Sequence, residues 1–472
     1  MTIAPLRLHP DRLFAADTGR RDLARQFYGH VGHLPIVSPH GHTDPNWFAG
    51  DAAFPDPSTL LIVPDHYIFR MLYSQGIKLE ALGVPRRDDG LTESDSRKIW
   101  QLFAANYHLF QGTPTRAWCD YVFVNLFGID RRLGAATADH YYDRIAERLA
   151  TPGFRPRALF GRFNIEVVAT TESPLDPLKA HEKIRQSGWQ GRVITAYRPD
   201  PVMDPEFEGF ASNLRQFGEI TGCDTGSYAG YLAAHRNRRA FFKGYGATST
   251  DHGHPTAATA DLSRAQAERL YAIVAKGGCT AQEAETFRAH MLTQMAEMSL
   301  EDGLVMQIHP GSMRNHNAGL FSQFGRDKGA DIPTRTDYVR ALKPLLDRFG
   351  NNAELTLILF TLDESSYSRE LAPLAGHYPA LRLGPAWWFH DSFEGMKRFR
   401  EMTTGTAGFY NTVGFNDDTR AYLSIPARHD VARRVDCAFL AELVATHRLE
   451  EDEAAEIAVD LAYGLAKRAY KL

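Results

Sequence analysis

Cysteine is scarce in this chain of 472 residues, and its four cysteines lie far apart in the sequence. No two of them have the Cys-x-x-Cys spacing of a zinc knuckle or of a thioredoxin-type redox site. We therefore expect reduced, mostly buried thiols rather than a disulfide framework at these positions, Cys119, Cys223, Cys279 and Cys437.

Long apolar runs are also missing. The longest uninterrupted stretch lies near residues 355–361, far below the roughly 20 residues that a membrane-spanning helix needs. The first residues, MTIAPLRLHPDRLF, contain no apolar stretch of the secretion-signal type. The sequence therefore predicts a cytoplasmic protein with no membrane partner.

Blocks of like charge are absent as well. Lys and Arg number 53 and Asp and Glu 57, which gives a formal net charge of −4 distributed along the chain. This balance argues against a nucleic-acid partner. The composition, with 44% apolar, 11% aromatic and 23% charged residues, excludes intrinsic disorder and predicts an ordinary globular chain.

The sequence does contain eight short apolar or β-branched runs, each followed by polar residues or by Gly and Pro. Such runs are typical of buried parallel strands. Helical spacing occurs between them, for example at 178–187, 262–276, 338–349 and 393–402. This alternation predicts an α/β fold, a distorted (β/α)8 TIM-type barrel. The expected strands lie at 34–39, 163–171, 192–199, 240–250, 304–311, 354–361, 380–386 and 408–415.

We expect residues 1–472 to form one domain, although length alone would suggest about three. The largest gap between expected strands, residues 46–156, contains helical stretches at 67–75, 94–105 and 140–149, and we interpret it as a helical insertion after the first strand. The C-terminal segment is acidic at its start and basic at its end, which suits a helix that caps the barrel. An open doubly wound sheet is the alternative, but SPHGHTDP, after the first run, lacks a glycine-rich phosphate turn.

Candidate metal ligands follow the expected strands, at the end of a barrel where active sites are found. His40 and His42 are two positions apart after the first run, so both imidazoles project to one side. Asp418 follows the eighth run, which neighbours the first in a closed barrel. Two histidines and a carboxylate with open positions suit one divalent ion such as zinc. The fourth run ends in Asp251 with Lys243 inside it, so the bridging lysine of a two-metal site is not expected.

Eight motifs occur in order along nearly the whole chain: PHGHTDP, PDHYIFR, FNIEVVATTESPLDPLKAH, AYRPD, TDHG, QIHPGSMRNHN, GPAWWFHDSFEGM and DDTRAYLS. Through them the chain resembles the uronate isomerase (glucuronate isomerase) family, a branch of the amidohydrolase superfamily. The resemblance implies interconversion of glucuronate with fructuronate and of galacturonate with tagaturonate. A uronate would then be the small-molecule partner.

By this resemblance His40, His42 and Asp418 match metal ligands. Tyr67 paired with Arg420 would transfer a proton through a cis-enediol, because a neighbouring guanidinium would lower the pKa of the phenol. Asp418 is the competing base, and a hydride shift across the metal is a third route. Arginines can fork two N–H groups onto a carboxylate, as a uronate requires. The remaining pocket positions that match the family are His66, Arg198, Asp251, His309 and Arg314.

Two other functions stay open from the sequence. A metal-dependent hydrolase acting on a sugar-acid lactone or amide would use the same ligands. A sugar-acid binding protein without turnover is the second rival. Trp387 and Trp388 are expected to pack in the core and at the rim rather than in the site. The sequence does not fix the oligomeric state and is compatible with a homo-oligomer.

Overall fold

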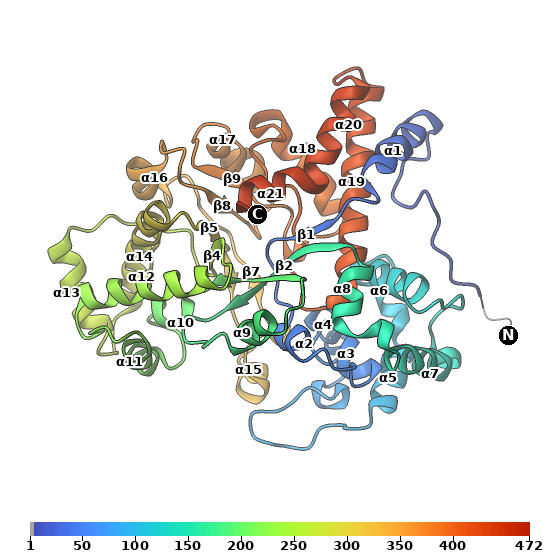
Figure 1. Ribbon diagram of the computed structural model, residues 1–472, viewed down its shortest axis with the longest axis horizontal. Coiled ribbons are helices and arrows are strands. Elements are labelled where there is room, and N and C mark those ends of the chain that lie inside the picture. The colour runs from blue at the N-terminus through green and yellow to red at the C-terminus, as the bar shows by residue number, and fades with distance from the viewer. Residues whose placement is uncertain (1–3) are drawn as a thin grey trace.

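A parallel sheet of seven strands forms the centre of the molecule, which the computed structural model describes for residues 4–472 (Figure 1). The strand order β1-β2-β3-β4-β5-β8-β9 follows the chain, and all neighbours pair in parallel. Helical connections cover the outside of this curled sheet, as parallel strands require. The strands are β1 (Ile36–Ser38), β2 (Ile165–Glu172), β3 (Arg192–Tyr197), β4 (Ser249–His252), β5 (Val305–Ile308), β8 (Leu357–Leu359) and β9 (Leu381–Leu383), with a separate antiparallel pair, β6 (Ser312–Met313) and β7 (Ile332–Pro333).

The eighth expected run, residues 408–415, lies beside β9 but does not form a regular strand. Its contact with β9 is one parallel bridge between Leu383 and Thr412, flanked by backbone hydrogen bonds. Gly408 and Gly414 have φ angles of 68° and 72°, which turn the backbone out of the extended conformation near both ends of the run. The predicted strand is therefore wrong as a regular element, although its place next to β9 is as expected.

The fourth expected run is a strand only at its end. Residues 240–244 belong to helix α12 (Tyr228–Gly244), and β4 begins at Ser249. The aromatic residues of this run resemble a strand in sequence but pack as part of the helix. Lys243 therefore lies on a helix, where its ammonium group donates to the carbonyl of Asp302, and not inside a strand as predicted.

The helices expected between the later strands are present, with small differences at their ends. They are α9 (Lys179–Gln186), α13 (Arg264–Val274), α16 (Lys343–Phe349) and α18 (Phe393–Ala407). The same part of the chain also contains α10 (Asp200–Met203), α11 (Phe210–Thr221), α14 (Ala281–Asp302), α15 (Ala318–Phe324) and α17 (Ala372–Ala375).

Seven helices lie between β1 and β2, where one would suffice to connect parallel strands (Figure 1). Three match the helical stretches expected there, namely α4 (His66–Ser74), α5 (Ser96–Ala105) and α7 (Ala138–Leu149). Their apolar faces share a cluster that contains Trp100 and continues to Ile36 of β1. The connection is therefore packed onto the sheet. The other four are α2 (Pro45–Gly50), α3 (Pro57–Leu61), α6 (Pro114–Asn125) and α8 (Pro156–Arg162).

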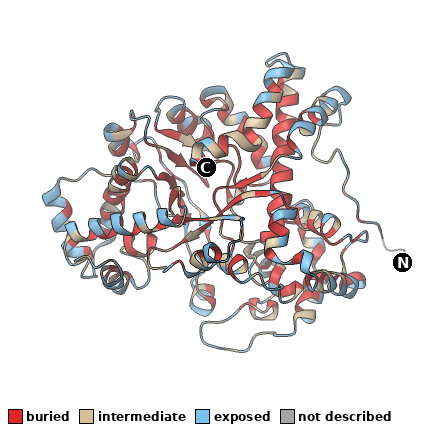
Figure 2. Cartoon of the chain, in the orientation of Figure 1, coloured by how far each residue is buried: buried red, intermediate tan, exposed pale blue. Residues whose placement is uncertain are grey.

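The C-terminal third adds two features around the sheet. Helix α19 (Ile425–Ala445) is buried along most of its length and packs against α1 (Thr18–Val31), α18 and α20 (Glu451–Val459) (Figure 2). The last helix, α21 (Leu465–Tyr470), ends in a buried tyrosine. The hydroxyl of Tyr470 donates to the side chain of Gln307 at 2.8 Å, and Gln307 lies on β5. The C-terminus therefore covers one end of the sheet, as the charge pattern predicted.

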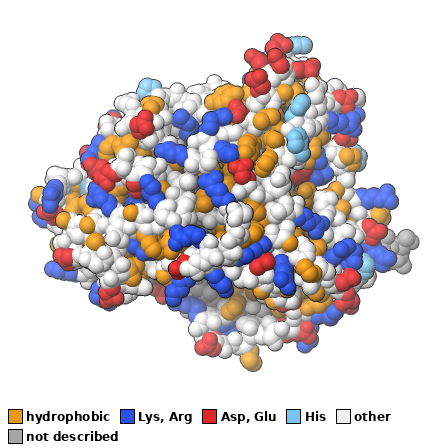
Figure 3. All heavy atoms as spheres, in the orientation of Figure 1, with side chains coloured by type: hydrophobic (Ala, Val, Ile, Leu, Met, Phe, Trp, Pro, Cys, Tyr) orange, Lys and Arg blue, Asp and Glu red, His pale blue; other side chains and the backbone are white. Residues whose placement is uncertain are grey.

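No helix within residues 4–472 combines the length and the apolar character needed to cross a bilayer. On the face drawn in Figure 3, acidic and basic side chains are interspersed. This surface agrees with the mixed charge pattern of the sequence.

Candidate active site

A pocket of about 730 Å³ opens at the carboxyl ends of the strands. Most of the strands contribute through residues that end or follow them, because parallel strands bring these positions to one edge of the sheet. Every site residue that the sequence suggested lines this pocket except Asp251, which is fully buried beneath its wall. The lining includes His40, His42, His66, Tyr67, Arg198, His309, Arg314, Asp418 and Arg420.

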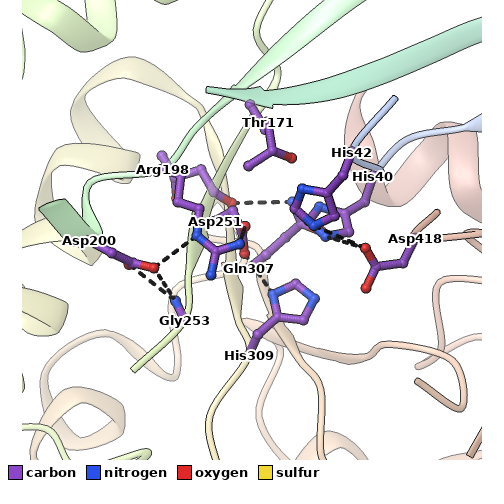
Figure 4. A network of polar contacts seen from close by, with 12 residues as sticks. His40, His42, Thr171, Arg198, Asp200, Asp251, Gly253, Gln307, His309 and Asp418 are labelled. Atoms are coloured by element: carbon purple, nitrogen blue, oxygen red, sulfur yellow. Dashed lines mark hydrogen bonds and ion pairs between the residues drawn. The ribbon is translucent and has the colours of Figure 1, made fainter. Parts of the chain in front are cut away.

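Asp418 is the centre of a cluster of imidazoles (Figure 4). Its Oδ1 lies 3.4 Å from Nε2 of His40 and 3.2 Å from Nε2 of His42. Trp387 packs in a buried apolar cluster, as expected, but its indole N–H also donates to the other carboxylate oxygen, so Trp387 belongs to the site as well. Burial alone would raise the pKa of Asp418, but the two histidines lower it well below its ordinary value. The carboxylate is therefore charged.

His309 is held in place by a carboxylate behind it. Its Nδ1 lies 2.7 Å from Oδ1 of Asp251, while Oδ2 of Asp251 accepts from Arg198 at 3.0 Å (Figure 4). Arg198 also donates to Asp200 at 2.8 Å. Although burial opposes it, Arg198 and His309 lower the pKa of Asp251 well below its usual range. The contacts that run from Asp200 through Arg198 and Asp251 place a carboxylate oxygen beside the His309 ring at the pocket wall.

The donor set fits a divalent metal ion. Ligand atoms of His40, His309 and Asp418 all lie within 4.8 Å of one another. Nε2 of His309 is buried and has no hydrogen-bond partner among residues 4–472, so it is free to act as a ligand. A histidine whose other nitrogen meets a carboxylate is the usual arrangement behind a metal. His309 therefore joins the ligand candidates, whereas the sequence suggested His40, His42 and Asp418.

The backbone at Asp418 is left-handed, with φ of 40°. A side chain other than glycine adopts this region at a cost, and such positions concentrate at functional sites. The amide of His42 donates to the carbonyl of the next residue, Thr419, at 3.1 Å. This contact brings the segments after β1 and after the eighth run together, so His42 and Asp418 meet as the sequence predicted.

Tyr67 reaches the pocket from the first turn of α4, whose N-cap is Asp65. Its hydroxyl donates to Oδ2 of Asp391 at 3.2 Å and to the carbonyl of Trp388 at 3.3 Å. Arg428 of α19 donates to the same Asp391 oxygen at 2.8 Å, and its guanidinium lies 5.2 Å from the Tyr67 ring centroid. Burial, followed by Asp391, raises the pKa of Tyr67 well above its ordinary value.

The expected pair of Tyr67 with Arg420 is not formed within residues 4–472. Arg420 instead lies 3.1 Å from Asp327, a residue of the segment that follows β6. Burial and Asp391 raise the pKa of the phenol, and the guanidinium that opposes them is that of Arg428 rather than Arg420. The arginine that shares the Asp391 oxygen with Tyr67 is Arg428, for which the sequence analysis proposed no role.

The arginines of the pocket are paired with acidic residues that sequence reasoning missed. Arg314 donates to Asp331 at 3.0 Å and lies 4.0 Å from Asp327, which Arg420 also contacts. Burial opposes it, but Arg420 and Arg314 lower the pKa of Asp327 well below its ordinary value. The only signal in the sequence is the position of both aspartates in the stretch after the fifth run.

His66 lies beside Tyr67, with ring centroids 4.7 Å apart in a stacked arrangement. Burial lowers the pKa of His66 to about 3, so its ring is neutral. Its Nε2 is buried and has no hydrogen-bond partner among the described residues. This nitrogen is available to a hydroxyl group of a ligand in the pocket.

Comparison with known proteins gives one consistent result. The family model described as glucuronate isomerase matches residues 14–470. The uronate isomerase of Rhizorhabdus wittichii is 70% identical over 472 residues, which is 100% of both chains. The solved structure of the glucuronate isomerase from Caulobacter crescentus has a TM-score of 0.98 at 62% identity, covering 99% of this chain and 97% of that chain. The uronate isomerase from Thermotoga maritima has a TM-score of 0.91 at 25% identity, covering 98% and 99%.

Proposed function

The chain belongs to the glucuronate isomerase family and interconverts uronates, and we propose that it does so in the pocket described above by moving a proton between carbon two and carbon one of the open-chain sugar acid. The observation that carries this proposal is the charged Asp418 between His40 and His42, facing a cavity lined by arginines. We assign glucuronate and galacturonate as the aldoses, and fructuronate and tagaturonate as the corresponding ketoses.

Recognition of the substrate carboxylate is assigned to the arginine-rich wall. Arg314, Arg326 and Arg420 line this part of the pocket together with Asp327 and Asp331. A guanidinium group offers two parallel N–H donors to a carboxylate. His66 and Arg198 are placed to contact the hydroxyl groups of the sugar chain, His66 through its unpartnered Nε2.

His40, His42 and Asp418, with His309 beside them, would hold one divalent cation, for which we propose zinc because nitrogen and carboxylate donors with open positions suit it. A bound cation would supply Lewis-acid polarisation of substrate oxygens. Asp251 fixes the ring of His309 through the 2.7 Å contact to Nδ1. The protein thereby arranges the ligand atoms before a substrate enters.

Proton transfer is assigned to Tyr67, with Asp418 as the competing base. The base takes the carbon-two proton, the hydroxyl proton of oxygen two passes to oxygen one, and the base returns a proton to carbon one. The intermediate is a cis-enediol, which forms as its enediolate anion, and Arg198 and Arg420 offset this negative charge from the pocket wall. Asp418 is already engaged by two histidines and Trp387, which favours Tyr67 for the proton.

We also propose that residues 1–472 form one domain, a distorted (β/α)8 barrel with residues 46–156 as an insertion. The bridge of Thr412 to β9 and the hydrogen bond from His42 to Thr419 support closure of the sheet through the eighth run. In this arrangement the insertion contributes Tyr67 and His66 from above the sheet edge.

Isomerisation of glucuronate in deuterium oxide tests the reaction. We expect proton NMR to detect fructuronate carrying deuterium at carbon one, because the base exchanges its proton with solvent during the enediol step. Ketose without label would support the hydride shift and count against Tyr67. No ketose at all would refute the proposed function, and turnover of lactones or amides in its place would support the hydrolase.

Asp251 and Asp200 provide a matched pair for testing the ligand assignment. Both carboxylates bind Arg198, but only Asp251 also contacts His309. We expect Asp251→Asn to weaken zinc binding by about 10- to 100-fold, because the imidazole loses its orienting partner. Asp200→Asn should leave the affinity within about threefold of the wild type. Competition with a chelator, followed by metal analysis, measures both, and equal losses would contradict the role of His309.

A further inference from the structure

Tyr67 can act as a base only if its own proton first leaves the phenol, and the structure limits where that proton can go. Two acceptors lie within hydrogen-bond distance of its hydroxyl among residues 4–472, the carbonyl of Trp388 and Oδ2 of Asp391. A backbone carbonyl does not take a proton under these conditions. Asp391 is therefore the one side chain in direct contact that can receive it.

The surroundings of Asp391 suit this task. Its carboxylate is largely buried beside Arg428, whose side chain is 3% exposed and which donates to the same oxygen that faces Tyr67. Burial raises the pKa of Asp391 to about 6, although Arg428 and Tyr67 oppose the shift. A buried carboxyl of this kind holds a proton more readily than a surface carboxylate does.

Arg428 is fixed more firmly than an ordinary counter-ion. Its guanidinium lies 3.6 Å from the ring centroid of Trp118 and also donates to the backbone carbonyl of Asp417 at 3.3 Å. The positive charge therefore stays beside the pair whether the negative charge resides on Asp391 or on Tyr67. Such a fixed charge lowers the cost of moving the proton between them.

Resting on the proposed function, we infer that Asp391 and Arg428 are positioning residues that hold the Tyr67 phenol and take up its proton, so that Tyr67 can act on carbon two. In this step the phenolic O–H bond breaks and an O–H bond forms on Oδ2 of Asp391. The phenolate then removes the carbon-two proton, the resulting phenol exchanges this proton with solvent, and Tyr67 later delivers a proton to carbon one. The proton on Asp391 passes back to Tyr67 after the catalytic cycle, and no other reactant is needed.

A double-mutant cycle tests this inference. In the wild-type background, Asp391→Asn should lower kcat by about 100-fold and leave KM within about threefold, because the amide keeps the shape but cannot accept a proton. In the Tyr67→Phe background, which itself should lose about 100-fold or more in kcat, Asp391→Asn should cause no further loss. Glucuronate deuterated at carbon two should give a larger kinetic isotope effect with Asp391→Asn.

The outcomes separate the inference from the proposed function. If Tyr67→Phe keeps the wild-type kcat, the base is not Tyr67 and that part of the proposed function fails. If Tyr67→Phe is impaired while Asp391→Asn has no effect, only the inference fails. Equal losses from Asp391→Asn in both backgrounds, or a loss confined to KM, would also overturn it, because Asp391 would then act independently of Tyr67.

Two further variants keep the test sound. Tyr28, Asp430 and Arg434 form a similar arrangement of a half-buried phenol with a buried carboxylate and guanidinium, and none of the three lines the pocket. Asp430→Asn should therefore reduce thermal stability without changing kcat.

If Asp391→Asn does not fold, Asp391→Asn with Arg428→Met removes both charges and avoids an unpaired buried ion. That double variant should show the same loss of kcat, and retention of wild-type kcat would refute the inference.

Discussion

Replacement of Asp418 by Asn is expected to reduce kcat by about 1,000-fold or more, close to abolition of turnover, while the fold remains intact. The carboxylate oxygen of Asp418 lies 3.4 Å and 3.2 Å from two imidazole nitrogens, and an amide cannot supply the same negative charge at that point. Both of its proposed roles, metal ligand and competing base, require this charge. Steady-state kinetics and metal analysis of the purified variant measure the two effects.

Asp436→Asn is the matched control for this substitution. Asp436 is also a buried aspartate, and it pairs with Arg400 at 2.7 Å, away from the residues that line the pocket. Breaking that pair should lower stability by about 3–5 kcal/mol and leave kcat unchanged at temperatures where the variant is folded. A value of kcat for Asp418→Asn within about tenfold of the wild type would contradict the assignment of Asp418.

The sequence was informative where function depends on residues at strand ends. His40 and His42 follow β1, and Asp418 follows the segment beside β9, so a prediction of the parallel order was enough to bring them together. For predicting which site residues lie together, the order of the strands in the sheet was more important than the regularity of each strand. The eighth run is not a regular strand, because Gly408 and Gly414 have positive φ angles. Asp418 nevertheless lies beside the imidazoles of His40 and His42.

Pairing between side chains could not be predicted in the same way. Tyr67, Asp391 and Arg428 come from α4, from the loop after β9 and from α19, and their contact depends on how these three elements pack. The family resemblance predicted a guanidinium next to Tyr67 and assigned it to Arg420. In the structure Arg420 pairs with Asp327 instead. No periodicity links these positions, so only the three-dimensional arrangement identifies the partners.

The fourth run illustrates a different limit. Residues 240–244 are rich in aromatic residues and read as a strand, but they continue the helical spacing of α12. A short apolar run has the same appearance in a buried strand and at the end of a buried helix. The error did not affect the site, because β4 still ends in Asp251 and His252.

Replacement of Glu172 by Gln is expected to stabilise the protein at pH 8 by up to about 3 kcal/mol. Glu172 lies on β2, is 8% exposed and accepts a hydrogen bond from Thr195, which Gln can also accept. Burial raises the pKa of Glu172 to about 7, above its ordinary value of 4.5. The folded state therefore binds a proton that the unfolded chain has released, and stability is lost as pH rises from about 4.5 through 7.

Urea unfolding of both proteins from pH 5 to pH 8 measures this difference. The variant and the wild type should have similar stability at pH 5, and the advantage of the variant should grow until Glu172 is ionised in the folded state. His181 lies 3.9 Å away, and burial lowers its pKa to about 4, so its ring is neutral in the folded state over this pH range and its contribution cancels in the comparison. Glu166→Gln on the same strand should have the opposite effect, because Glu166 is paired with Lys467 and loses that partner. A stability difference between Glu172→Gln and the wild type that does not change with pH would show that Glu172 is not the titrating group.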